Sequence, residues 1–123
     1  MEINELRLEE GAIQYLGLNS ESLVIEVKRW NQEFLKITIN SYVKFIEYDS
    51  IGREISEFLI LENSEFLKKE KEELVKLDFD ENECNQLVHL KFVGLSELPL
   101  LDVIADKNEI HVIRMEIQST PLS

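Results

Sequence analysis

Cysteine, proline and glycine are scarce in this chain of 123 residues, with one, two and four copies respectively. The single cysteine, Cys84, excludes an intrachain disulfide and is typical of a reducing compartment. The first residues lack the basic and apolar regions of a secretory signal. The longest uninterrupted apolar run, Phe58–Leu61, has four residues, whereas a membrane span needs ~18. We therefore expect a soluble, cytoplasmic protein.

Recognisable catalytic and metal-binding motifs are also lacking. The chain contains no G-x-S-x-G elbow, no P-loop and no G-x-G-x-x-G pattern, and its four glycines are too dispersed to cradle a phosphate. No C-x-x-C or H-x-x-x-H spacing is present either. We expect no metal or other cofactor, and nothing in these patterns argues for an enzyme.

Positive charge is in short supply, because 13 Lys and Arg residues stand against 25 Asp and Glu residues, for a net charge of −12. The densest basic cluster, residues 68–71, is followed at once by Glu72 and Glu73. Nucleic-acid binding usually needs cations gathered on one face, and an anionic membrane surface repels an acidic protein. We therefore expect neither nucleic acid nor a membrane as a partner.

What the sequence has in excess is acid, concentrated between residues 47 and 83. This stretch holds 13 acidic and 5 basic residues, a net charge of −8. Such a segment can be a solvated face, which is the ordinary case, or a surface that binds a cationic partner.

Alternating apolar and polar residues predict β-structure in the first half of the chain. A weakly patterned strand over 11–18 precedes three alternating segments at 23–30, 34–39 and 42–48. The inward residues would be Leu23, Ile25, Val27, Leu35, Ile37, Ile39, Val43 and Phe45. Connections this short indicate an antiparallel meander.

The register of the second and third strands depends on the loop between them. A three-residue loop, Asn31–Glu33, sets Val27 opposite Ile37, so that apolar residues share one face. A two-residue loop would set Val27 opposite Lys36 and mix the faces. The three-residue loop is therefore favoured.

Helical spacing of apolar residues follows in the acidic stretch. It predicts a short helix over 52–61 and a second helix over 65–77. Asp80 and Glu83 fit a capping box at the start of about one further turn.

The last third returns to β-structure. Alternation predicts a strand over 87–93, and residues 100–105 and 110–117 are expected to pair as a hairpin across 106–109. The chain is thus predicted to be a single α+β domain, 1–123, with a mostly antiparallel sheet of about six to seven strands and two helices inserted after the first four strands.

The segment Asp78–Asn82 alternates oxygen-bearing side chains like the start of an EF-hand loop. The sixth position, however, is Glu83 instead of glycine, and the twelfth is His89 instead of a bidentate glutamate. A capped helix start in an acidic loop is the better interpretation. Cys84 follows these acids and is expected to be a small packing residue.

Two histidines, His89 and His111, lie between apolar neighbours on predicted strands. If those strands pair, the two rings and Asp102 could form a small-ligand or enzymatic site. The alternative for His89 is an outward polar residue on a half-exposed strand, which patterning favours.

Aromatic residues among lysines are predicted on the outward faces of the early strands. They could join two copies of the chain in a homodimer, or helices could cover them as a second core layer. These residues are Trp30, Phe34, Tyr42, Ile46 and Tyr48, with Lys28, Lys36 and Lys44.

Four segments of the chain share the patterning of a known group of proteins. They are the runs from Leu23 to Asn31, Leu35 to Ile39, Val43 to Phe45 and Leu98 to Ala105. In this patterning and in its acidity the chain resembles small bacterial immunity proteins of the polymorphic-toxin type. The resemblance covers about two thirds of the chain.

This resemblance implies a non-enzymatic protein-binding domain that neutralises a toxin. A basic toxin would associate rapidly with an acidic inhibitor because their charges attract. The residues expected to bind such a basic protein partner are six acidic side chains and two aromatic anchors. They are Glu70, Glu72, Glu73, Asp78, Asp80, Glu81, Trp30 and Tyr48.

Overall fold

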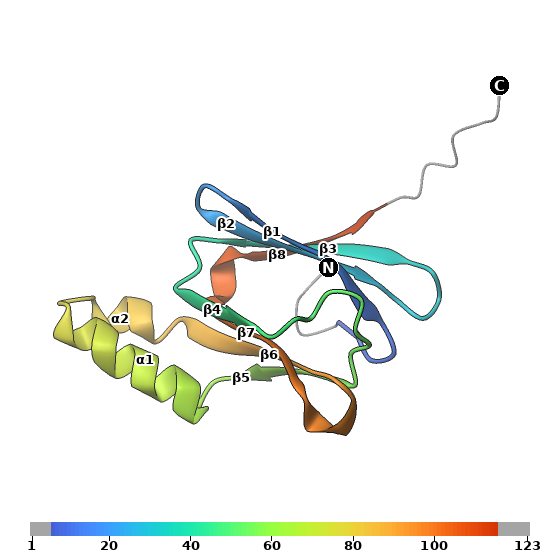
Figure 1. Cartoon of the computed structure of the whole chain (residues 1–123). Helices are drawn as coiled ribbons and strands as arrows, with labels where there is room; N and C mark the ends of the chain where they lie inside the picture. Colours follow the sequence, from blue (N-terminus) through green and yellow to red (C-terminus); the bar gives the residue numbers. More distant parts are fainter. Residues whose placement is uncertain (1–5, 116–123) are drawn as a thin grey trace.

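The computed structural model describes residues 6–115, which form two four-stranded antiparallel sheets packed face to face (Figure 1). Sheet A has the strand order β1-β2-β3-β8, and sheet B has the order β4-β7-β6-β5. Sheet A consists of β1 (Ala12–Asn19), β2 (Ser22–Lys28), β3 (Phe34–Asn40) and β8 (Ile110–Met115). Sheet B consists of β4 (Lys44–Glu47), β5 (Glu57–Leu61), β6 (Leu87–Val93) and β7 (Pro99–Asp106).

Two α-helices, α1 (Glu65–Lys76) and α2 (Glu81–Cys84), follow β5 and pack on the outer face of sheet B. Two 3-10 turns, η2 (Leu95–Glu97) and η3 (Lys107–Glu109), lie on either side of β7. None of the helices among residues 6–115 has the length and apolar character that crossing a membrane requires.

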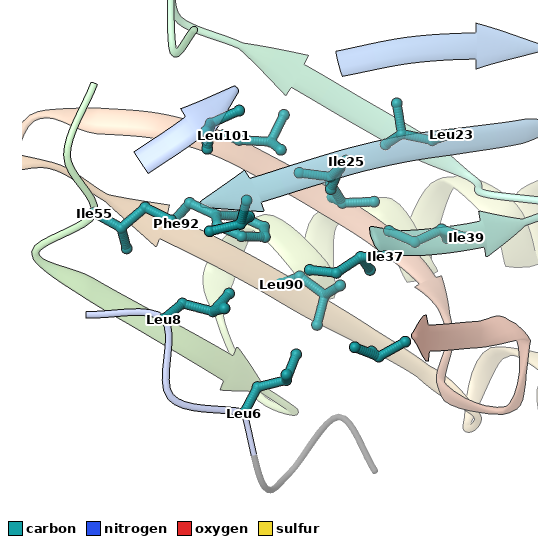
Figure 2. Packing of buried hydrophobic residues seen from close by; sticks show 14 of the residues in the cluster. Leu6, Leu8, Leu23, Ile25, Ile37, Ile39, Ile55, Leu90, Phe92 and Leu101 are labelled. Atoms are coloured by element: carbon teal, nitrogen blue, oxygen red, sulfur yellow. The ribbon is translucent and has the colours of Figure 1, made fainter. Parts of the chain in front are cut away.

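The main core fills the space between the two sheets, where Ile25 and Ile37 of sheet A meet Leu90 and Phe92 of sheet B (Figure 2). Burial alternates strictly along β2 and β3, as period two requires. The six residues of these strands that were predicted to point inward are all fully buried, which confirms that part of the prediction.

The central strands of sheet B, β6 and β7, are buried on both faces, because α1 and α2 cover the face that turns away from sheet A. Six consecutive residues of β7, from Leu100 to Ala105, are therefore buried. The second apolar cluster lies between this face and the helices, and it contains Leu67, Leu74, Cys84, Leu87 and Ile104. Cys84 is the packing residue that was expected.

The α+β class and the antiparallel pairing are confirmed, but the prediction of one sheet with six to seven strands is wrong. In the described part of the chain, eight strands form two sheets, and the helices follow five strands instead of four. The predicted helix over 52–61 is instead a loop and strand β5, in which Phe58 pairs with Phe92. The ring centroids of this pair are 4.8 Å apart. Pairing with β6 therefore overrides a short apolar run that fits either a helix or a strand.

Strand pairing also differs from the prediction in three places. Val27 lies opposite Leu35, two residues from the expected partner, because a turn from Arg29 to Gln32 lengthens the loop. A shift of two residues keeps every side chain on its predicted face. Strand β4 pairs with β7 instead of β3, and β7 and β8 lie in different sheets instead of forming a hairpin. Positions 116 and 117 of the last predicted strand lie outside the described residues.

Candidate functional site

Two of the three residues proposed for a ligand or enzymatic site meet in sheet B. His89 of β6 and Asp102 of β7 lie on adjacent strands, and His89 Nε2 is 2.6 Å from Asp102 Oδ1. His111 is elsewhere, exposed on β8 of sheet A opposite Thr38. The expectation that His89 faces solvent is wrong, because α1 covers that face and leaves the residue 3% exposed.

Hydrogen bonds extend this pair in both directions. Ser64 Oγ lies 2.8 Å from His89 Nδ1, and the Tyr48 hydroxyl donates to Asp102 Oδ2 at 3.0 Å. With the ring proton on Nε2, His89 donates to Asp102 and accepts the Ser64 hydroxyl proton. Every polar group in this chain of four residues then has a partner, as buried polar groups require.

The hydrogen bonds around Asp102 favour the ionised form of its carboxyl group. Burial alone raises the pKa of this carboxyl group, but hydrogen bonds from His89 and Tyr48 and the nearby positive charge of Lys91 outweigh it, so the pKa lies below its usual value. Burial and the hydrogen bond to Asp102 raise the pKa of Tyr48. Tyr48 therefore stays a hydrogen-bond donor at neutral pH.

The network also fixes the start of α1. Ser64 is the N-cap of this helix, and its Oγ accepts a hydrogen bond from the Leu67 amide at 3.1 Å. Two residues further on, the Phe66 ring packs against the His89 ring with centroids 4.8 Å apart. The first turn of the helix thus covers the buried histidine.

The hydrogen-bonded series Ser64, His89 and Asp102 has the same order as the nucleophile, the base and the orienting acid of a catalytic triad. A nucleophile, however, must reach a substrate, and here Phe66 packs on the ring of a histidine that is 3% exposed. The Ser64 oxygen is also engaged by the Leu67 amide. The physical role that these contacts support is to hold α1 on sheet B.

The predicted acidic surface separates into two parts. Helix α1 carries four glutamates and four lysines, so it has no net charge. Glu70 lies 3.6 Å from Lys44 of β4, and Glu73 lies 3.7 Å from Lys76. These carboxylates are therefore balanced at close range, and Glu72 is an exposed residue on the same neutral helix.

The second part is the segment after α1, which we call the acidic turn: Asp78, Asp80, Glu81 and Glu83. All four residues are exposed, and no ion pair within residues 6–115 involves them. No lysine or arginine occurs from Leu77 to Leu90. Glu83 was predicted as a capping residue and not as a binding residue, although it lies in the same stretch without lysine or arginine as the predicted binding residues.

Local geometry holds the acidic turn in place. The Phe79 amide donates to the Leu74 carbonyl and the Asp78 amide to the Val75 carbonyl, which together make a Schellman end to α1. Asp78 has a φ of 64°, the left-handed conformation that this motif needs. Asp80 then caps α2 as predicted, although its carboxylate accepts from the Asn82 amide instead of the third helical position.

The two proposed aromatic anchors lie apart from the acidic turn. Trp30 is 63% exposed in the loop between β2 and β3, which Figure 1 shows at the opposite end of the molecule from α1 and α2. Tyr48 follows β4 and is tied to Asp102.

The proposed aromatic surface is likewise divided. Phe34 lies on sheet A, opposite Lys28 of β2. Tyr42 packs against Phe45 and the main core, with ring centroids 5.4 Å apart. Ile46 lies on β4 of sheet B. These side chains therefore do not form one continuous face.

Comparisons with protein-family models, with curated proteins and with solved structures give no match.

Proposed function

We propose that this protein is a non-enzymatic binding domain for a basic protein partner, and that it acts as an immunity protein that neutralises a basic bacterial toxin. The observation that carries the proposal is the acidic turn. Its four carboxylates are exposed, have no ion pair within the described residues and lie in a stretch without cations. Such a surface attracts a cationic protein at long range and suppresses binding of acidic ones.

The acidic turn is better suited to this role than the glutamates of α1. Lys44 and Lys76 already lie close to two of those glutamates, so a partner would have to compete for them. Asp78, Asp80 and Glu81 need no such exchange. The Schellman end and the capped turn also fix their backbone before a partner arrives, which lowers the entropy cost of binding.

The test is a rapid-mixing measurement with the purified product of the gene next to its own. We expect the association rate constant to fall by about tenfold or more between about 20 and about 300 mM salt, because surface charges become screened over roughly this range. We also expect co-expression of this protein to protect cells from the toxic partner.

A charge-reversal variant and a matched control locate the surface. The variant Asp78→Lys, Asp80→Lys, Glu81→Lys should lose most of the salt-dependent rate. The control Glu9→Lys, Glu57→Lys, Glu97→Lys changes the net charge equally at other exposed positions. Equal rates for the two variants would show that total charge, and not the acidic turn, controls association.

A further inference from the structure

The acidic turn borders a pocket of about 310 Å³ between the helices and one end of sheet B. Its lining comes from the end of α1, from α2, from the start of β6, from the end of β7 and η3, and from the loop before β4. Its apolar lining residues include Leu74, Phe79, Cys84 and Leu87, and its acidic lining residues include Glu83 and Glu109.

The floor of this pocket is apolar and firmly packed. Leu74, Cys84 and Leu87 belong to the second apolar cluster and are at most 8% exposed. Phe79 forms a wall and is half exposed, and its amide bond to Leu74 holds it at the end of the helix. The pocket is therefore formed before any ligand binds, which favours a side chain of complementary shape.

The rim of the pocket is acidic. Glu83, Asp106 and Glu109 contribute three carboxylates, and no lysine or arginine is among the lining residues. Lys107 is a neighbour in sequence, but it lines a different pocket, beside Asn63 and Lys71. An apolar floor under an acidic rim repels anions and suits a ligand that is apolar at one end and cationic at the other.

We infer that this pocket receives an apolar side chain lying next to an arginine in an exposed segment of the partner. This inference rests on the proposed function and adds the anchoring chemistry to it. The apolar side chain would cover the floor, and the guanidinium would lie on the rim, where carboxylates accept paired hydrogen bonds from its planar fork. Aromatic residues and arginine are also the residues most enriched at the centres of protein interfaces.

The test uses three blocked dipeptides as probes: acetyl-Phe-Arg-amide, acetyl-Gly-Arg-amide and acetyl-Phe-Glu-amide. Each is titrated into the ¹⁵N-labelled full chain while amide shifts are recorded. We expect acetyl-Phe-Arg-amide to bind with a dissociation constant of about 1 mM and to shift the amides of Leu74, Cys84 and Leu87. The other two probes should bind at least about fivefold more weakly.

Two double variants check the rim. Glu83→Gln with Glu109→Gln should weaken acetyl-Phe-Arg-amide binding by about fivefold, whereas Glu57→Gln with Glu97→Gln should change it by less than about twofold. Both pairs replace exposed or half-exposed glutamates, and the amide spectra report whether each variant is folded.

Equal binding of the Phe-Arg and Gly-Arg probes would overturn the inference, because the apolar floor would then contribute nothing. Unchanged binding in the rim variant would overturn it as well. Either outcome would leave the proposed function standing if the partner still associates in a salt-dependent way. Conversely, loss of that salt dependence would refute the proposed function whatever the dipeptides do.

Discussion

The two sheets of this protein share one core but differ in what lies on their outer faces. On sheet A the outer residues of β2 and β3 are partly open to water, and no helix within residues 6–115 covers them. On sheet B the helices seal the outer face, so β6 and β7 are buried on both sides. A polar group can therefore remain on sheet A with water as its partner, whereas on sheet B it must find a partner within the protein.

The net charge also differs between the strands of sheet A and the other half of the molecule, which consists of sheet B and the α-helices. The strands of sheet A carry three basic residues and one acidic residue, a net of +2. The strands and α-helices of the other half carry six basic and ten acidic residues, a net of −4. The sealed half thus contains both the buried His89–Asp102 pair and the exposed acidic turn. A helix that covers a sheet has one face toward the sheet and another toward water. The covered sheet can therefore contain a buried polar pair while the outer surface carries charge.

The largest expected difference between the sheets comes from two isoleucines on their outer faces. Ile104 of sheet B is fully buried under the helices, whereas Ile113 of sheet A is 55% exposed. Ile104→Ala should lower the free energy of unfolding by about 3 kcal/mol, and Ile113→Ala by less than about 1 kcal/mol. Urea unfolding measures both. Similar losses would mean that the helices do not seal sheet B in solution.

A smaller effect is expected from Asp102→Asn, which leaves the buried network without its two-sided acceptor. We expect a loss of about 2 kcal/mol at pH 7, whereas Glu26→Gln on the outer face of sheet A should change stability by less than about 0.5 kcal/mol.

The same variant should also change the dependence of stability on pH. Because the folded-state pKa of Asp102 is lowered, its contribution is complete above the unfolded value of roughly 3.9 and is lost as the pH falls through the folded value. Unfolding curves from pH 6 to 2 should therefore be flatter for Asp102→Asn below about pH 4. If stability depended on pH equally steeply in the variant and in the wild type below about pH 4, the role of Asp102 in the network would be contradicted.

The smallest effect separates a structural serine from a reactive one. Ser64→Ala removes the N-cap and should cost about 1 kcal/mol, and a fluorophosphonate probe should not label Ser64 in the native chain. Ser22, whose hydroxyl donates to Asn40 on sheet A at 2.7 Å, provides the matched control, and Ser22→Ala should cost about 0.5 kcal/mol. Labelling that disappears in Ser64→Ala would instead identify a nucleophile.

How far the sequence predicts the fold depends on whether a feature is local. The alternation in β2 and β3, the helix from Glu65 and the cap at Asp80 all follow from neighbouring residues, and the structure bears them out. The division into two sheets depends on which distant strands pair. Because the loops after β3 and β7 are short, the sequence predicts β3–β4 and β7–β8 pairs. Both loops instead carry the chain from one sheet to the other.

The candidate sites follow the same rule. The lack of cations near Asp78 and Asp80 is visible in the sequence, and it also marks Glu83. The contact between Ser64 and His89 spans 25 positions and depends on where α1 lies, so no local pattern reveals it. The pocket is hidden for the same reason, since its lining runs from Ser41 to Glu109.

The strand order β1-β2-β3-β8 has a consequence for how the chain is made. During synthesis β3 emerges early and pairs with β2, but its second neighbour, β8, is the last of the eight strands within residues 6–115. Until β8 arrives, one edge of sheet A exposes unpaired amides and carbonyls, the kind of edge that recruits strands from other chains. The completed sheet B lies between these two events in the sequence. Nascent chains halted before residue 110 should therefore self-associate through β3, whose free edge is covered by β8 in the complete fold.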